Sequence, residues 1–261
     1  MDEQRLAQVG LRYAVDGAVA TITLDRPQVR NAQTPAMWRT LAELGRSIGD
    51  EVRVVVVTGE GASFSAGLDT SVLDPSQRSQ DSLLDLLELD DAGMADAIGE
   101  FQEGFTFLRD PRFVSVAAVR GHAVGAGFQL ALSCDLRIAA DDAKFCMKEA
   151  ALGLVPDLTG TKPLVDVVGY SRALEICATA RTVRAEEALA LGIVQQVVPS
   201  EELEDAVGAM VSALTAPMPG AVRETKGLLL DAERRSLDEQ RRVEREAQVR
   251  RFREVAGLAG L

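Results

Sequence analysis

Two apolar runs separated by a turn of small residues constrain this 261-residue chain more than any other feature. Val114–Val119 predicts a buried strand, and residues 128–136 predict a buried helix that leads into a second strand at residues 136–139. The turn between them, Gly125-Ala126-Gly127, would leave free backbone N–H groups at the positive end of that helix. Such a turn can hold a phosphate or the oxygen of a carbonyl that becomes an enolate, although it can also serve packing alone.

A second glycine-rich connection follows another apolar run further upstream. Residues 52–57 form a β-branched run that is typical of a strand buried on both faces. They lead into residues 58–69, whose sequence is TGEGASFSAGLD. Two such loops can each supply one backbone N–H to a single oxygen, which is the minimum that an oxyanion hole requires.

Four motifs in a fixed order carry a resemblance to a known family. They are residues 25–32 (DRPQVRNA), 61–69 (GASFSAGLD), 121–135 (GHAVGAGFQLALSCD) and 151–156 (ALGLVP). Together they resemble the enoyl-CoA hydratase/isomerase (crotonase) superfamily, over about residues 15–199 and more loosely to the C-terminus. The resemblance implies an α/β fold, a crotonase-like spiral of repeated ββα units, and an acyl-CoA thioester as substrate. Because one fold hosts many chemistries, the motifs leave the reaction open.

The resemblance also divides the chain into two regions. Residues 1–199 would form the acyl-CoA-binding core, and residues 200–261 would form a C-terminal helical region for trimerisation. We expect helices at residues 201–214 and 221–254. One apolar stripe in this region needs a covering surface, which argues for a homotrimer or for trimers paired into a homohexamer; it consists of Leu203, Val207, Met210, Val211 and Leu214.

By resemblance, the thioester oxygen would lie between the backbone N–H groups of Leu68 and Ala126. Glu149 would move a proton at carbon, because it stands where family hydratases carry a catalytic carboxylate. Its apolar neighbours should raise its pKa toward a useful range. Without the resemblance, an ion pair of Glu149 with Lys148 or Arg137 is the simpler interpretation.

Two further positions set this chain apart from a hydratase. Gln129 stands where family hydratases place their other Glu. Because an amide cannot act as a general base, we call this a vacant-base position, one that lacks the base of the hydratases. Asp157 stands where several isomerases of the superfamily place a proton-transferring Asp, and where the dehalogenase members place their nucleophile. Asp157 can equally cap a helix that begins near Thr159, or occupy a Pro-Asp turn.

Coenzyme A would contact two loops of the predicted core. Arg26 and Arg30 could meet its phosphates, although both could also be ordinary surface arginines. By resemblance, the other candidates around them are Val29, Ala32, Ala66, Gly67, Asp69, Thr70, Ser71 and Gly125. Coenzyme A belongs to the substrate, so no separate cofactor is expected, and no cluster of residues has metal-ligand spacing.

Composition limits the partners and the compartment. A net charge of −12 argues against a nucleic-acid or anionic-membrane partner. The apolar runs are shorter than a membrane span and the N-terminus has no apolar signal region, so we expect a cytoplasmic protein. Cys134, Cys146 and Cys177 have neither metal nor redox spacing, which predicts buried, reduced thiols. His122 is the single histidine, and we expect it to be packed and hydrogen-bonded.

Local patterns predict several further elements. Strands at residues 11–15 and 19–24 would flank a hairpin turn at Asp16-Gly17, and Thr34 would cap a helix at residues 36–48. Residues 72–104 are rich in Asp, Glu and Leu. They predict a mobile acidic loop with amphipathic helical turns, or alternatively a lid whose leucines line an acyl pocket.

The pairing of Glu149 with a vacant base at Gln129 favours proton transfer over the addition of water. We therefore expect isomerisation of a double bond through an enolate that the oxyanion hole stabilises. Enoyl-CoA hydration in fatty-acid β-oxidation is the alternative. It ranks second because it needs a further base that Gln129 does not supply. An acyl-CoA-binding member of the family without catalytic activity is a third interpretation.

Overall fold

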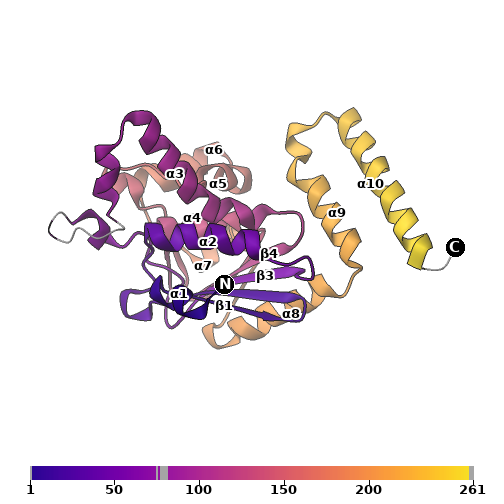
Figure 1. The fold of residues 1–261 in the computed structure, drawn as a ribbon, viewed down its shortest axis with the longest axis horizontal. Coiled ribbons are helices and arrows are strands. Elements are labelled where there is room, and N and C mark those ends of the chain that lie inside the picture. Colours follow the sequence, from indigo (N-terminus) through magenta and orange to yellow (C-terminus); the bar gives the residue numbers. More distant parts are fainter. Residues whose placement is uncertain (1, 75, 77–81, 259–261) are drawn as a thin grey trace.

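A six-stranded sheet forms the centre of the computed structural model, which describes residues 2–74, 76 and 82–258 (Figure 1). Its strands, in spatial order, are β1 (Leu11–Asp16), β2 (Val19–Leu24), β3 (Val54–Gly59), β4 (Val114–Val119), β6 (Leu136–Ala140) and β9 (Gln196–Val198). β1 and β2 form the predicted antiparallel hairpin, and all other neighbours in this sheet are parallel. A smaller sheet contains β5 (His122–Val124), β7 (Lys144–Cys146) and β8 (Val183–Arg184).

Helices follow the strands in a recurring order. The α-helices are α1 (Glu3–Gln8), α2 (Pro35–Ser47), α3 (Asp91–Thr106), α4 (Ala126–Ser133), α5 (Thr161–Val168), α6 (Tyr170–Thr179), α7 (Ala185–Ala190), α8 (Leu203–Thr215), α9 (Pro219–Leu230) and α10 (Leu237–Leu258). The sequences β1-β2-α2, β4-β5-α4 and β6-β7-α5 each place two strands before an α-helix, which agrees with the expected ββα repeats. The side chain of Thr34 accepts a hydrogen bond from the N–H of Met37, so the predicted cap of α2 is confirmed.

The main sheet is buried on both faces, as the β-branched run at residues 52–57 predicts. Val55 and Val57 point into the larger core, which α2, α3 and α4 cover. Val54 and Val56 point to the opposite face, where they pack with Leu203 of α8. A strand with apolar groups on both sides is typical of a parallel sheet between layers of helices.

The apolar stripe of α8 is covered within the chain, and this corrects one argument for assembly. Leu203 and Val207 are buried against Val116 and Ile138 of the main sheet, and Met210, Val211 and Leu214 pack partly buried at the same surface. The stripe therefore needs no second subunit, because the outer face of the sheet already occupies it. The oligomeric state stays a prediction.

The end of the chain is a helical hairpin and not the single long helix expected at residues 221–254. α9 and α10 are separated by a 3-10 turn at Ala232–Arg234, and together they project from the body of the molecule (Figure 1). α9 is anchored by Lys226, whose ammonium group contacts Asp135 at 2.6 Å. Arg53 also donates to the carbonyl groups of Thr215 and Pro217, just before α9 begins.

Two other expectations about helices need correction. The helix after the glycine turn begins at Ala126 and ends at Ser133, earlier than predicted, because Cys134 is already extended and the chain then leads into β6. Within the acidic segment, α3 is a regular helix that Asp90 caps by accepting from the N–H of Gly93 at 2.8 Å. Its Phe101 and Phe105 pack on the Trp38 ring, at 5.3 and 6.2 Å between ring centroids, which explains why the acidic sequence still folds.

The leucines of this segment divide between the core and the solvent. Leu83 and Leu86, in the 3-10 helix η4 (Leu83–Glu88), pack partly buried against the main core. Leu87 and Leu89 are exposed. The remaining part of the predicted mobile loop, residues 75 and 77–81, lies outside the described residues, so the predicted lid stays a prediction.

Candidate active site

Two glycine-rich loops meet beside β5, although they are far apart in the sequence. Ser65 donates its N–H to the carbonyl of His122 at 2.7 Å and accepts from the N–H of Val124 at 3.0 Å. Gly67 then passes so close to the second loop that a Cβ there would lie 2.4 Å from the Val124 carbonyl oxygen. Only glycine allows this approach, and it carries Leu68 toward the start of α4.

The N–H groups of Leu68 and Ala126 are available to a ligand. Among the described residues, no backbone or side-chain group accepts a hydrogen bond from either of them. Gly125, which precedes α4, has φ 51°, a left-handed conformation that favours glycine and turns the chain into the helix. Two free donors on neighbouring loops, one of them at a helix N-terminus, have the form of an oxyanion hole.

Glu149 lies directly against this turn. A methyl group on Gly125 would be 3.3 Å from Glu149 Oε1. The residue begins the 3-10 helix η6 (Glu149–Leu152), and it is buried, with 8% of its surface exposed. Its Oε2 is buried and has no hydrogen-bond partner among the residues that the structure describes. Neither Lys148 nor Arg137 forms an ion pair with Glu149 in the described part of the chain, so the ion-pair interpretation is wrong.

Arg137 is occupied elsewhere, since it donates to the carbonyl groups of Ile193, Ala131 and Cys134. Without a cation beside Glu149, burial dominates and raises its pKa. The backbone N–H of Glu149 itself and the hydrogen bond from Gln129 oppose this rise, and the negative charge of Asp157 adds to it. A buried carboxyl group with a raised pKa and one free oxygen can both accept a proton and return it.

Gln129 points into the same site from α4, and both polar atoms of its amide are hydrogen-bonded. Its Nε2 donates to Glu149 Oε1 at 2.7 Å. Its Oε1 accepts from the N–H groups of Leu158 and Gly160, at 2.9 and 3.1 Å. The predicted vacant base is therefore filled by an amide that contacts the neighbouring carboxylate directly.

Asp157 lies in the loop that Gln129 holds. Gln102 of α3 donates to the Asp157 carbonyl at 2.6 Å, which fixes the backbone from the other side. The interpretation of Asp157 as a helix cap is wrong, because α5 begins at Thr161 and its N-cap is Gly160 without a side-chain hydrogen bond. The residue as a whole is exposed, yet the surrounding protein still raises the pKa of its carboxyl group by desolvation.

The enoyl-CoA hydratase/isomerase family model matches residues 14–256, nearly the whole chain. The chain belongs to this family. Among its relatives, the human mitochondrial Δ(3,5)-Δ(2,4)-dienoyl-CoA isomerase is 35% identical over 224 residues, covering 81% of this chain and 65% of that protein. The short-chain-enoyl-CoA hydratase of Clostridium acetobutylicum is 32% identical over 217 residues, covering 81% of this chain and 77% of its own length.

A solved structure extends the likeness to the entire fold. A candidate enoyl-CoA hydratase of Thermobifida fusca, crystallised with CoA, is 50% identical with a TM-score of 0.94, and 98% of each chain is covered. The same protein has also been crystallised with acetoacetyl-CoA. The chain is thus a crotonase-superfamily enzyme with the crotonase fold, and relatives named as hydratases and isomerases leave its reaction open.

Arg26 links the segment at residues 25–32 to the first glycine-rich loop. Its guanidinium contacts Asp69 Oδ2 at 2.8 Å and donates to the Ala32 carbonyl at 2.7 Å. Although burial alone would raise the pKa of Asp69, hydrogen bonds from Ser71 and Arg26 lower it. Arg26 is therefore not an ordinary surface arginine, and its charge is already paired.

The other predicted coenzyme A contacts differ in their exposure. Arg30, Thr70 and Ser71 are exposed, and Val29 is exposed next to Arg30. Ala32, Gly67 and Gly125 are buried, and Ala66 is half-buried. His122 is half-buried, with Nδ1 3.2 Å from the Ser63 hydroxyl; burial, Lys144 and Arg30 all lower its pKa. The expectation of a packed, hydrogen-bonded His122 is confirmed in part.

Three buried polar residues that sequence reasoning missed hold the first loop in place. Asn31 donates to the carbonyl groups of Glu60 and Ser63, and Gln33 donates to the Ser65 hydroxyl. Ser65 in turn donates to the Asn31 carbonyl and accepts from the Gly67 N–H. No clear signal in the sequence identifies Asn31 and Gln33, because the motif at residues 25–32 (DRPQVRNA) is already rich in polar and charged side chains.

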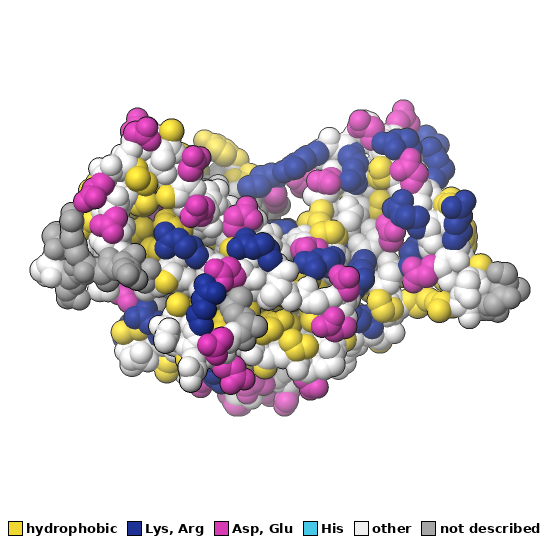
Figure 2. All heavy atoms as spheres, viewed as in Figure 1, with side chains coloured by type: hydrophobic (Ala, Val, Ile, Leu, Met, Phe, Trp, Pro, Cys, Tyr) yellow, Lys and Arg dark blue, Asp and Glu magenta, His cyan; other side chains and the backbone are white. Residues whose placement is uncertain are grey.

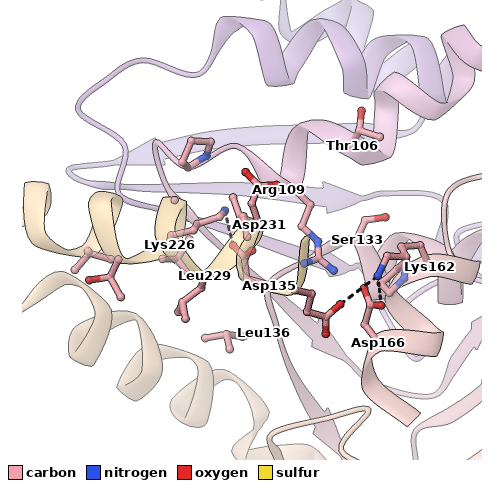
Figure 3. Close-up of a pocket in the computed structure, with 18 of the residues that line it drawn as sticks. Thr106, Arg109, Ser133, Asp135, Leu136, Lys162, Asp166, Lys226, Leu229 and Asp231 are labelled. Carbon is pink, nitrogen blue, oxygen red and sulfur yellow. Dashed lines mark hydrogen bonds and ion pairs between the residues drawn. The ribbon is translucent and has the colours of Figure 1, made fainter. Parts of the chain in front are cut away.

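The three thiols and one further cavity complete the description of the residues around the site. Cys134 and Cys146 are buried and Cys177 is half-buried, and all are free. No group of three metal-binding side chains occurs among the described residues, and none of the described helices is long and apolar enough to cross a membrane. A cavity of about 1210 Å³ separates α9 from the core; Arg109, Ser133, Lys162 and Leu229 line it (Figure 3).

Proposed function

We propose that this enzyme moves a double bond along the acyl chain of a coenzyme A thioester. The observation that carries the proposal is the free Oε2 of buried Glu149 beside two N–H groups that lack acceptors. A base and an oxyanion site at adjacent positions are what enolate chemistry requires. The CoA and acetoacetyl-CoA complexes of the Thermobifida fusca relative support an acyl-CoA substrate.

In the proposed reaction, Glu149 removes a proton from C2 of a 3-enoyl-CoA. The electrons of the C2–H bond enter a dienolate, whose oxygen accepts hydrogen bonds from the N–H groups of Leu68 and Ala126. A proton is then delivered to C4, the C2=C3 double bond forms, and the thioester carbonyl is restored. Glu149 returns the proton to C4, or Asp157 supplies it as a second acid. Each oxyanion donor contributes about 3 kcal/mol to lowering the barrier.

Hydration of 2-enoyl-CoA is the second candidate, and relatives named hydratases support it. Its weakness is at Gln129, since the direct contact of 2.7 Å between Nε2 and Glu149 Oε1 leaves no space for water between these groups. Acyl-CoA binding without turnover is the third candidate.

Assays with 3-enoyl-CoA and 2-enoyl-CoA of several chain lengths distinguish the three candidates. We expect isomerisation to be faster than hydration, with Glu149→Gln inactive. Hydration faster than isomerisation would reject isomerisation as the main reaction, and tight binding without any turnover would reject catalysis. Asp157→Asn tests the second acid, because a C4 proton supplied by Asp157 makes this variant nearly as slow as Glu149→Gln.

We further propose that the chain forms a trimer, or trimers paired into a hexamer, through its C-terminal hairpin. Support comes from exposed apolar side chains on α9 and α10, where Leu229 and Phe252 are 68% and 66% exposed. On the face shown in Figure 2, Lys and Arg side chains gather over this hairpin, while acidic side chains predominate near α3. Light scattering at micromolar concentration tests the assembly, and a monomer would contradict it.

A further inference from the structure

We propose that Gln129 is a positioning residue that makes Glu149 act through one oxygen only and sets the place of Asp157. The inference rests on the proposed function. It starts from the three hydrogen bonds of a single buried amide, which join α4, η6 and the loop before α5.

The orientation of the Gln129 amide is fixed by its partners. Oε1 faces the N–H groups of Leu158 and Gly160, which can only donate. A flipped amide would set Nε2 against these two donors and Oε1 against the Glu149 carboxylate. Nε2 must therefore donate to Glu149 Oε1, and it does so at 2.7 Å in a fully buried contact.

This contact makes the two oxygens of Glu149 unequal. Oε1 is occupied by the Gln129 donor, whereas Oε2 is buried without any partner. A proton taken from the acyl chain must bind Oε2, since a proton on Oε1 would displace the Gln129 hydrogen bond. The same oxygen is then the one that can return the proton.

We call the three hydrogen bonds of the Gln129 side chain the Gln129 clamp; two of them hold the loop that precedes α5. Thr159 has φ 68°, a left-handed conformation that is unfavourable for a residue with a branched side chain. The two N–H groups that flank it, those of Leu158 and Gly160, both donate to Gln129 Oε1. Gln129 therefore holds a strained turn, and Asp157 immediately precedes that turn.

The titratable groups around Glu149 leave Gln129 as its only hydrogen-bonding side chain among the described residues. Asp157 acts on it through charge from the loop, and the thiols of Cys146 and Cys177 lie close enough to sense its charge. Loss or reversal of the Gln129 donor should therefore appear directly in the titration of Glu149.

Gln129→Glu separates the two halves of the clamp. One oxygen of the new carboxylate can still accept from Leu158 and Gly160, while the other faces Glu149 Oε1 and must share a proton with it. We expect the acid limb of the pH profile of kcat/KM to shift to higher pH by more than about one unit, while KM changes little. Gln129→Met keeps the side-chain volume and loses all three hydrogen bonds. It should shift the same acid limb to higher pH by about one unit and also lower kcat.

Ser133→Ala is the matched control. Ser133 is buried on the same helix and donates to the Gln129 carbonyl at 2.9 Å, without contacting Glu149. This variant should lose some thermal stability and keep the wild-type pH profile. Acid limbs that coincide in wild type, Gln129→Glu and Gln129→Met would overturn the inference.

A direct titration separates failure of the inference from failure of the proposed function. Infrared spectroscopy identifies the Glu149 carboxylate band as the one lost in Glu149→Gln, and it needs no turnover. If this band titrates at higher pH in Gln129→Glu but no isomerisation occurs, the clamp stands and the proposed function fails. If isomerisation depends on Glu149 but the band titrates as in wild type, the function stands and the clamp fails.

Discussion

Glu149 and Asp135 are both carboxylates largely enclosed by the protein, but their surroundings differ completely. Asp135 Oδ2 contacts the ammonium group of Lys226 at 2.6 Å and also accepts from the N–H and hydroxyl of Ser115, at 2.8 and 3.0 Å. In the described part of the chain, one neutral side chain donates to Glu149 Oε1, and Oε2 has no hydrogen-bond partner. The first carboxylate has its charge compensated, and the second does not.

This difference separates a structural carboxylate from a reactive one. A charge matched by a cation and two further donors fastens α9 to the core. A buried oxygen without a partner costs folding free energy, but it is ready to bind a proton from a substrate. The following substitutions test this comparison.

The largest effect should come from Glu149→Gln. Removal of the general base should lower kcat for 3-enoyl-CoA isomerisation by about 10³-fold, while acyl-CoA binding is retained. Kinetics together with equilibrium binding of an acyl-CoA analogue measure both effects. Retention of isomerase activity in this variant would contradict the assignment of the reactive carboxylate.

Lys226→Met tests the structural side of the comparison. It leaves Asp135 buried without its cation and should lower the free energy of unfolding by about 3 kcal/mol. Lys162→Met is the control, because the Lys162 ion pair with Asp166 is mostly exposed and should contribute much less to stability. Denaturant unfolding compares them, and equal stability of both variants would show that the buried pair does not anchor α9.

Gly125→Ala should disturb the reactive carboxylate through the backbone. The new methyl group would lie 3.3 Å from Glu149 Oε1, so displacement of the site should lower kcat by about 10²-fold. Gly17→Ala is the control with a similar φ, which is 54° at Gly17 and 51° at Gly125, but open space surrounds Gly17. Both variants should lose about 1 kcal/mol of stability, and only the first should lose activity.

The smallest effect concerns the dependence of stability on pH. Burial raises the pKa of Glu149 in the folded state above its ordinary 4.5, so the folded protein favours the protonated form. The stability contributed by that form is complete below the unfolded pKa and is lost as the pH rises through the folded pKa. Glu149→Gln should therefore unfold at a higher temperature than wild type at pH 8, and this gain should vanish toward pH 4.

Calorimetry of the two proteins across this range measures the difference. A gain that persists unchanged at low pH would show that the charge of Glu149 is not what destabilises the folded state. Lys226→Met, measured in the same way, should show no gain in unfolding temperature over wild type at pH 8, because Asp135 has lost its cationic partner in this variant.

Much of the fold follows from patterns within single segments. The Asp16-Gly17 hairpin, the Thr34 cap and the doubly buried β3 each depend on residues close in sequence, and all are found in the structure. The glycine-rich motifs likewise predict loops that bring Leu68 and Ala126 into one site, because glycine is required where the backbone approaches closely. α3 was misjudged because its stability comes from contacts with Trp38 on another helix.

The sequence by itself therefore determined the family, the two loops and the residue types of the site. Tertiary structure decided which atoms of those residues are free. Gln129 finds partners on Glu149, Leu158 and Gly160, and α8 covers the outer face of the main sheet. The physical reason is that a buried polar group is satisfied by whatever packing brings to it, and these partners come from segments well separated along the chain.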